Sequence, residues 1–228
     1  MDLSELEKKI KIQFNDRNLL QSSLTHRSYL NENRKWPLAH NERLEFLGDA
    51  VLELVVTEFL YKKYPEKPEG ELTAFRAALV NTVSIADAAT QLGMNEYLLL
   101  SRGESKDTGR ARGIILANAF EAVIGAIYLD QGYDAARDFI DAQLFHKTDD
   151  VVEKRLWQDA KSKLQEISQE RLSVTPTYEL VNQTGPDHDK TFVVAAHLGR
   201  EKVALGEGRS KQEAEQDAAQ KALIAKGW

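Results

Sequence analysis

Apolar residues return at helical spacing through the first two-thirds of the chain. Leucine, isoleucine, valine and alanine recur about every three to four positions, which is the period of an amphipathic helix. Proline and glycine interrupt this pattern in several places and mark expected helix ends. The periodic segments are residues 18–30, 43–63, 71–92 and 114–129. We therefore expect residues 1–155 to form an all-α domain.

A charged stretch at residues 153–158 has no sustained apolar face and marks a domain boundary. After it, residues 160–170 again favour a helix. Apolar and polar residues then alternate, which predicts strands at residues 177–182, 191–197 and 202–206. Ser210 can cap a last helix, because its hydroxyl accepts a hydrogen bond from a free amide of the first turn. The order α-β-β-β-α predicts a small α+β domain in residues 156–228.

The composition is typical of a globular protein in water. Its 228 residues are 42% hydrophobic and 29% charged. No cysteine is present, which excludes disulfides and thiolate metal sites. The N-terminus does not resemble a signal peptide, and no apolar stretch approaches the roughly 20 residues of a membrane span. We expect a cytoplasmic protein that makes no contact with a membrane.

The net charge of −6, taken alone, argues against a protein that binds nucleic acid. Residues 1–156 contain 20 basic and 25 acidic side chains, and residues 157–228 contain 10 and 11. The two parts therefore carry net charges of −5 and −1. Any affinity for nucleic acid must come from where the basic residues lie, and not from their total.

Three carboxylates share one side of the helix expected at residues 43–63. At about 100° per residue, Glu42, Glu45 and Asp49 fall within about 60° of one another. Like charges at this spacing destabilise a helix by roughly a few tenths of a kcal/mol each, and a bound divalent cation would offset that cost. The expected core stripe lies on the opposite side of the helix and consists of Leu44, Leu47, Val51, Leu54 and Val55.

A second polar pair, Asn118 and Glu121, lies inside the apolar run IILANAFEAVIGAIYLD. Polar groups in such a run are expected to be partly buried, which is costly unless they are paired. A metal ion shared with the first three acids would satisfy both groups, and carboxylate and amide oxygens suit Mg²⁺ or Mn²⁺. The alternative is that the acids form an ordinary solvated helix face.

Phe46 lies about 40° from Glu42 around the same helix, away from the apolar stripe. An aromatic side chain beside carboxylates is either an exposed residue without a special role, which is common, or an anchor for a partner.

At these residues the sequence closely resembles bacterial ribonuclease III. NERLEFLGDAVL at 41–52 matches the signature of that family nearly letter for letter. The similarity continues through LTHRSY at 24–29, EGELTAFRAALVN at 69–81 and ANAFEAVIGAIYLD at 117–130. The part after residue 156 is similar to the double-stranded RNA-binding domain of the family. The resemblance implies the ribonuclease III endonuclease fold, followed by that α-β-β-β-α domain.

The resemblance also implies roles for individual residues. Glu45, Asp49, Asn118 and Glu121 would bind the metal, with Asp49 and Glu121 most closely tied to catalysis. Glu42 and Glu69 match two further acidic positions, which in the family serve RNA engagement. Phe46 would pack into a pocket of a second subunit and so give a homodimer.

Asn118 departs from the family, which usually has aspartate at this position. Asparagine keeps one oxygen ligand but removes a full negative charge. A unit charge about 4 Å from another contributes roughly 4 kcal/mol at an effective dielectric constant near 20, before desolvation. Metal affinity is therefore expected to be lower, or a second ion to bind only together with the substrate.

The C-terminal domain resembles its family at three RNA-binding elements. Gln165 and Glu166 on the first helix, and His188 in the loop at residues 183–190, would face successive minor grooves of the RNA. Lys211 begins the last helix, where the helix dipole favours a phosphate. That helix usually opens with several lysines, whereas here Gln212 and Glu215 follow Lys211. We expect weak RNA binding; His188 read alone would be a solvent-exposed loop histidine.

The function expected from the resemblance is Mg²⁺-dependent hydrolysis of double-stranded RNA, with Mn²⁺ as a possible substitute. Bound metal lowers the pKa of water and stabilises the leaving oxygen, and the products carry 5′-phosphate and 3′-hydroxyl ends. Expected substrates are structured precursors of ribosomal and messenger RNA. One alternative is a catalytically weakened double-stranded RNA-binding protein, in which Asn118 marks the lost activity. A second is a helical metal-dependent phosphohydrolase that acts on nucleotides.

Overall fold

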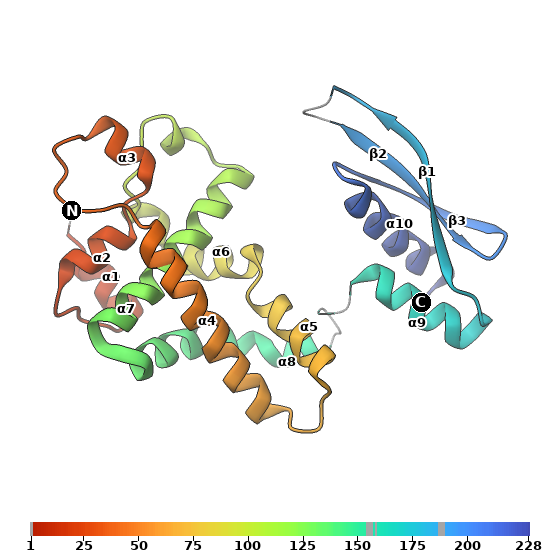
Figure 1. Ribbon diagram of the computed structural model, residues 1–228, viewed down its shortest axis with the longest axis horizontal. Helices are drawn as coiled ribbons and strands as arrows, with labels where there is room; N and C mark the ends of the chain where they lie inside the picture. Colours follow the sequence, from red (N-terminus) through yellow and green to blue (C-terminus); the bar gives the residue numbers. More distant parts are fainter. Residues whose placement is uncertain (1, 154–156, 158, 187–189) are drawn as a thin grey trace. The chain divides into compact units, whose positions relative to one another are not determined.

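A computed structural model describes residues 2–153, 157, 159–186 and 190–228 of the chain. It divides into two compact units, Met1–Trp157 and Gln158–Trp228. The first unit is helical, and the second combines helices with a three-stranded sheet (Figure 1). The expected order of an all-α domain followed by an α+β domain is thereby confirmed. The boundary expected after residue 155 falls among residues outside the described ranges.

The helices of the first unit largely follow the apolar pattern. Their bounds are α1 Ser4–Ile10, α2 Arg17–Ser23, α3 Arg27–Glu32, α4 Glu42–Lys63, α5 Glu69–Leu79, α6 Thr82–Gln91, α7 Arg110–Leu144 and α8 Thr148–Glu153. The periodic segment 71–92 divides into α5 and α6, because the Asn81 side chain caps α6 by accepting from the Ser84 amide. The segment 18–30 divides near Thr25, which forms an isolated bridge with Leu99.

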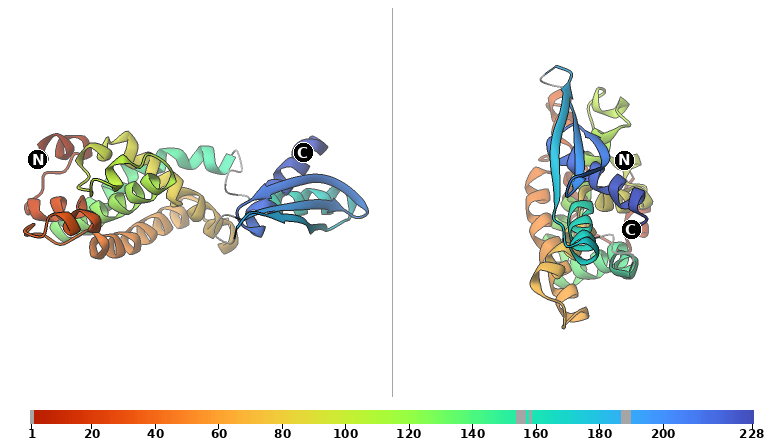
Figure 2. Two further views of the ribbon diagram at one scale, coloured as in Figure 1. Left: turned by 90° about the horizontal axis from the view of Figure 1, so that it is seen from above. Right: turned by 90° about the vertical axis from the view of Figure 1, so that its right-hand side faces the viewer.

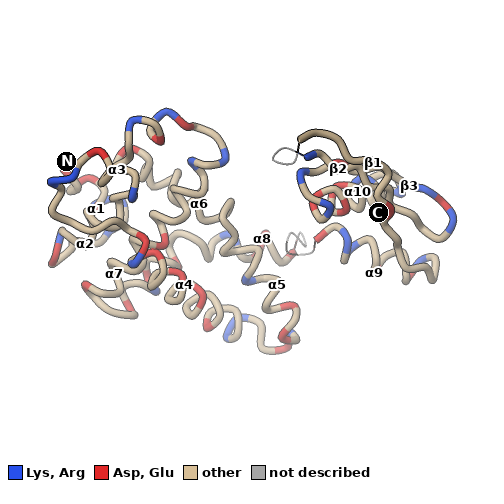
Figure 3. The backbone as a smooth tube through the Cα atoms, turned by 45° about the horizontal axis from the view of Figure 1, so that its top comes forward, with Lys and Arg blue, Asp and Glu red and all other residues tan. Residues whose placement is uncertain are grey.

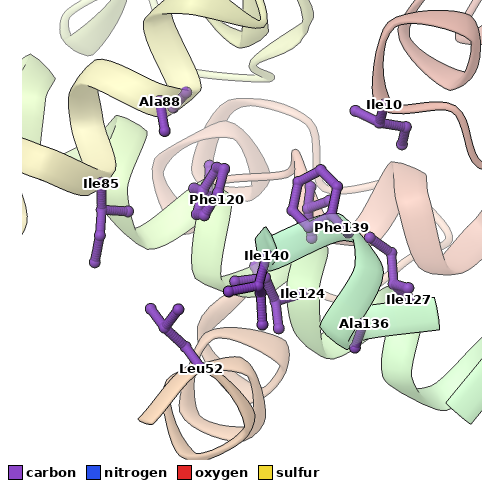
Figure 4. Packing of buried hydrophobic residues seen from close by; sticks show 14 of the residues in the cluster. Ile10, Leu52, Ile85, Ala88, Phe120, Ile124, Ile127, Ala136, Phe139 and Ile140 are labelled. Carbon is purple, nitrogen blue, oxygen red and sulfur yellow. The ribbon is translucent and has the colours of Figure 1, made fainter. Parts of the chain in front are cut away.

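Helix α7 forms the centre of the first unit and is the longest element. Gly132 lies inside it with a positive φ of 83°, a backbone conformation that glycine adopts without a Cβ penalty. The kink returns the second half of α7 to the core, where Phe139 meets Phe120 at a ring-centroid distance of 5.3 Å (Figure 4). Both rings are buried, and burial of such a side chain contributes about 1.5–3 kcal/mol.

The apolar run of α7 corrects one expectation about membrane spans. The helix is long and apolar enough to cross a bilayer by length and composition, with a mean hydropathy of 1.5 over an 18-residue window. The statement that no apolar stretch approaches that length is therefore wrong. Within the first unit, however, 61% of this window is buried, which is typical of the core helix of a folded domain.

The second unit is an antiparallel sheet with both helices on one face (Figure 2). The elements are α9 Ala160–Leu172, β1 Pro176–Thr184, β2 Thr191–Leu198, β3 Glu201–Gly208 and α10 Lys211–Lys226. The strand order is β1-β2-β3, and the core lies between sheet and helices, around Leu164, Ala196 and Leu223. Ser210 caps α10 as expected, with its Oγ accepting from the Glu213 amide at 3.1 Å.

Candidate active site

Two glycines bring α4 and α7 into backbone contact. A Cβ added to Gly48 would lie 1.7 Å from the carbonyl oxygen of Glu121, and one added to Gly125 would lie 2.2 Å from that of Leu44. No side chain larger than hydrogen fits at either position, so the two helices cross at this pair. Glu45 and Asp49 flank Gly48 in α4, and Glu121 lies one turn before Gly125 in α7.

The crossing gathers the residues that the sequence suggested for metal binding. Glu45, Asn118 and Glu121 are partly buried, and Asp49 is exposed. The Asn118 side chain hydrogen-bonds to the Glu45 carboxylate. Figure 3 shows the acidic positions along α4, and the charges of Asp49 and Glu45 act on Glu121 of α7. Asn118 and Glu121 are therefore partly buried, as expected, and lie beside the acids of α4.

Burial and mutual repulsion shift the pKa values of these acids. Burial, together with the nearby charges of Asp49, Glu45 and Glu53, raises the pKa of Glu121 to about 7. Burial also raises the pKa of Glu45, with added repulsion from Glu42, while the hydrogen bond from Asn118 opposes the rise. The crossing of α4 and α7 therefore disfavours negative charge unless a cation compensates it.

The apolar stripe of α4 lies closer to the acids than the helical wheel suggested. Leu54, expected in the core, is 58% exposed, whereas Leu52 and Val56 are buried. The reason is the crossing at Gly48, since Glu45 lies only about 60° from Gly48 around the helix. The acids therefore flank the contact with α7 and do not lie opposite the core. Without this geometry they could not meet Glu121.

The residues at the crossing fit a hard divalent cation by their chemistry. They offer three carboxylates and one amide oxygen, which are the ligands that Mg²⁺ and Mn²⁺ prefer. Within the described ranges, no three acidic or histidine side chains lie close enough together to hold a metal ion as they stand. A shared ion would therefore require these side chains to move closer together.

Glu42 and Glu69 lie at the starts of α4 and α5. Glu42 is exposed at the start of α4, with one carboxylate oxygen 3.5 Å from Arg27 Nη1. Glu69 begins α5 and accepts a hydrogen bond from the Thr73 hydroxyl at 3.1 Å. It lines a groove of about 450 Å³ together with Tyr61, which follows Glu45 by roughly 24 Å along α4. Glu42 lies one turn before Glu45, and its charge raises the pKa of that carboxyl, whereas the structure does not bring Glu69 to the proposed metal ligands.

Several residues that shape the site were not found from the sequence. Gly48 and Gly125 set the helix crossing. The sequence signal for them was a glycine in the middle of each apolar helix, which lowers helix stability and so indicates a close packing contact. Glu53 and Arg76 form an ion pair at 2.7 Å beside the acids. Only the fold reveals that pair, because the two residues belong to different helices.

The suggested RNA-binding residues lie at separate elements of the second unit. Gln165 and Glu166 are exposed on α9, and Lys211 is exposed at the first position of α10. His188 lies outside the described residues. Lys161 is held inside the unit, because its Nζ lies 2.5 Å from Glu215 Oε2 and 4.9 Å from the centre of the Tyr178 ring.

Phe46 stands out from α4, with 81% of its surface exposed. It lines a groove of about 650 Å³ together with Leu19, Leu47 and Leu129, and Leu129 is itself 55% exposed. Phe46 therefore lies off the core, as expected, next to other apolar side chains.

Comparison with known families defines the class of the protein. A family described as Ribonuclease-III-like matches residues 16–148, and the Double-stranded RNA binding motif matches residues 160–225. A helical nuclease domain joined to such a motif defines an endoribonuclease specific for double-stranded RNA.

Individual relatives identify the family. Ribonuclease 3 from Enterococcus faecalis is 46% identical over 220 residues, which cover 96% of this chain and 95% of the relative. Ribonuclease 3 from Nitratiruptor sp. is 45% identical over 221 residues, which cover 97% and 95%. The chain belongs to the ribonuclease III family, and the resemblance seen in its sequence is confirmed.

The helical unit is also similar to solved structures of a nuclease domain. Two structures of the ribonuclease III nuclease domain from Campylobacter jejuni are 40% and 41% identical to this chain, with TM-scores of 0.56 and 0.55. Each covers 62% of this chain, and the match spans 98% and 95% of those chains. One of them describes structural flexibility in a region involved in dimer formation of that domain.

Proposed function

We propose that this chain hydrolyses phosphodiester bonds of double-stranded RNA with the help of a divalent metal ion held by Glu45, Asp49, Asn118 and Glu121. The observation that carries the proposal is the α4/α7 crossing, where Gly48 and Gly125 let these four residues converge from distant parts of the sequence. The physiological ion is Mg²⁺, and Mn²⁺ substitutes for it. The products carry 5′-phosphate and 3′-hydroxyl ends.

The protein side chains have distinct tasks in this proposal. Asp49 and Glu121 are the catalytic carboxylates, and Glu45 supplies a third charge. Asn118 contributes a neutral oxygen and steadies Glu45 through its hydrogen bond. When bound, the ion neutralises charge on the phosphodiester and makes water a stronger acid. The partial burial of Glu121 limits competition from bulk water, which strengthens its interaction with a cation.

The second unit would hold the duplex while the first cuts it. Gln165 and Glu166 on α9, His188 and the N-terminus of α10 at Lys211 are the proposed contacts. Glu42 and Glu69 on the first unit add further contacts with the RNA, Glu42 beside the cleavage centre and Glu69 at the start of α5. The low positive charge of the second unit predicts modest affinity with a shallow salt dependence.

We further propose a homodimer that forms through the face around Phe46. An exposed phenylalanine beside a groove lined by Leu19, Leu47 and Leu129 supports a self-complementary contact, because a C2 interface joins the same patch on both subunits. Two sites in one dimer would cut opposite strands of the duplex. We place the enzyme in the cytoplasm, with structured precursors of ribosomal and messenger RNA as its substrates.

The proposal is tested by incubating a long end-labelled RNA duplex with the full chain. Cleavage is expected with Mg²⁺ or Mn²⁺ and not with EDTA, and a single-stranded RNA of the same sequence should remain intact. Product 5′ ends should accept label from polynucleotide kinase only after phosphatase treatment, since they carry a phosphate. Binding of duplex without cleavage at any Mg²⁺ concentration would instead support a weakened RNA-binding protein in which Asn118 marks lost activity.

A further inference from the structure

The line of acids on α4 continues one turn beyond Asp49, to Glu53. Around the helix Glu53 falls about 40° from Asp49, so its carboxylate lies on the same side. Arg76 of α5 holds this carboxylate, with its Nε 2.7 Å from Glu53 Oε2. The Arg76 Nη1 also donates to the Thr57 hydroxyl at 2.8 Å. Arg76 therefore contacts two successive turns of α4 from the neighbouring helix.

The ends of the acidic line are paired, and its middle is not. Glu42 meets Arg27 at 3.5 Å at one end, and Glu53 meets Arg76 at 2.7 Å at the other. Among the described residues, Glu45, Asp49 and Glu121 have no ion-pair partner. The pair at Glu53 is the shorter of the two, and both of its side chains are only about a third exposed, at 34% and 39%. It is therefore less screened by water than a surface pair.

The charge of Glu53 reaches the proposed metal centre. It is one of the three carboxylates whose repulsion raises the pKa of Glu121, together with Asp49 and Glu45. A unit charge roughly 10 Å from a divalent ion changes its affinity by about three- to tenfold when water partly screens the interaction. Whatever neutralises Glu53 therefore also adjusts how strongly the centre attracts a cation.

We infer that Arg76 is a positioning residue that holds Glu53 at the α4/α5 contact, neutralises its charge and keeps its carboxylate out of the metal centre. Metal affinity is then set by Glu45, Asp49, Asn118 and Glu121. This inference rests on the metal assignment proposed above. Arg76 acts through Glu53 and does not itself touch the ion.

The two single substitutions have opposite expected effects. Arg76→Gln leaves the Glu53 charge unpaired, so metal affinity rises about three- to tenfold. Glu53→Gln leaves the Arg76 cation unpaired, so metal affinity falls by a similar factor. The double variant has neither charge and returns to within about twofold of the wild type. Loosened packing of α5 on α4 would instead weaken binding in both single variants and would not be rescued in the double variant.

The test measures binding of Mn²⁺ to the full chain without RNA, from the free-ion signal in electron paramagnetic resonance. Thr57→Val is the matched control, because it removes the hydrogen bond to Arg76 without changing charge and should stay within about twofold of the wild type. Arg76→Lys retains the cation and should do the same. If Arg76→Gln does not fold, Glu53→Gln decides, since unchanged affinity in that variant overturns the inference.

Other outcomes separate this inference from the metal assignment. One such outcome is that the wild type binds Mn²⁺, that Glu121→Gln abolishes this binding, and that the Arg76 and Glu53 substitutions leave it unchanged. This result supports the metal centre and overturns the role of Arg76. Wild-type protein that binds no Mn²⁺ overturns both. Weaker binding of duplex RNA by Arg76→Gln in EDTA, with unchanged Mn²⁺ affinity, would make Arg76 a phosphate contact and would also contradict the inference.

Discussion

Asn118 stands where the resemblance to the family leads us to expect aspartate, and its surroundings show what an uncharged side chain changes there. Its amide hydrogen-bonds to Glu45 and opposes the rise in the pKa of that carboxyl. An aspartate at this position would remove the donor and place a fourth carboxylate beside Glu45, Asp49 and Glu121. The neutral side chain therefore relieves repulsion in the metal-free protein and lowers the charge available to a cation.

Asn118→Asp should lower the stability of the metal-free protein and also lower the Mg²⁺ concentration that cleavage requires. The metal-free variant is expected to melt a few degrees lower, since about 1 kcal/mol shifts the melting temperature of a protein of this size by about 2–4 °C. With Mg²⁺ the added charge is paired, so half-maximal cleavage should need less metal. The measurement is a Mg²⁺ titration of the cleavage rate, alongside melting curves in EDTA. An equal or greater Mg²⁺ requirement would place Asn118 outside the coordination sphere, as a helix-packing residue.

At the scale of elements, the sequence predicted what lies within one helix better than what lies between two. The run in α4 and the alternation in β1, β2 and β3 were found because each pattern is local. The second half of α7 was missed, because Gly132 breaks the periodicity and the return to the core depends on tertiary packing. The meeting of α4 and α7 was expected only through a shared metal ion, and the close crossing at Gly48 and Gly125 was missed, since a helical wheel shows which residues share a side but not which helix covers them.

Gly48→Ala should separate the two helices that build the site. The new Cβ would overlap a backbone oxygen 1.7 Å away, and a backbone contact cannot relax as a side chain can. We expect a loss of about 1–3 kcal/mol or more in the free energy of unfolding, and a large loss of cleavage even where the variant folds. Chemical denaturation and cleavage rate measure the two effects.

Gly70→Ala is the matched control, since Gly70 lies in α5 and nothing approaches its added Cβ within 4 Å. It should be neutral or stabilise by up to about 1 kcal/mol. Equal stability and activity for both alanine variants would contradict the close helix crossing.

The contact between α9 and α10 restrains the positively charged side chain of Lys161, which could otherwise contact RNA. Glu215→Gln should free Lys161 from its ion pair and add one positive charge near the exposed face of α9. Affinity for duplex RNA is expected to rise a few-fold, and the slope of log affinity against log salt should steepen by up to about 0.9, by analogy with DNA.

Glu201→Gln provides the control for charge alone. It also breaks an ion pair, with Lys226, but at the other end of α10, roughly 16 Å from Glu215. This distance exceeds the screening length of about 8 Å at physiological salt. RNA affinity measured across a salt series should therefore change in Glu215→Gln and not in Glu201→Gln. Parallel salt curves for wild type and Glu215→Gln would show that Lys161 gains no contact with RNA.

At the scale of the whole molecule, the order of two domains was predictable because the apolar period changes from helix to strand along the chain. The proposed homodimer was harder to predict, because the sequence gives only one indication of it, an aromatic residue placed beside acids. The structure adds that Phe46 is 81% exposed and borders an apolar groove. His188 and the proposed boundary after residue 155 remain predictions, because they lie outside the described residues.

Phe46→Ala should weaken the proposed homodimer. Truncation of an aromatic anchor at the centre of an interface often costs more than about 2 kcal/mol, which raises the dissociation constant roughly 30-fold. Sedimentation velocity across a concentration series measures the shift. Tyr61→Ala is the control, because Tyr61 is also an exposed aromatic residue of α4, at 73%, and should leave assembly unchanged. A wild-type protein that remains monomeric at micromolar concentration would contradict the dimer.

The most direct test of the account compares wild type with Glu121→Gln for cleavage and binding of one duplex RNA across a Mg²⁺ series. Glutamine has nearly the same shape, so the variant should fold and bind RNA within about twofold of wild type, while cleavage falls by at least about 100-fold. Burial raises the pKa of Glu121 from 4.5 to about 7, so the native-state cost of its charge builds up between these two pH values and is fully present above pH 7. At pH 8 in EDTA, the variant should therefore melt no lower than wild type. Cleavage within a few-fold of wild type would contradict the central role of Glu121 at the α4/α7 crossing.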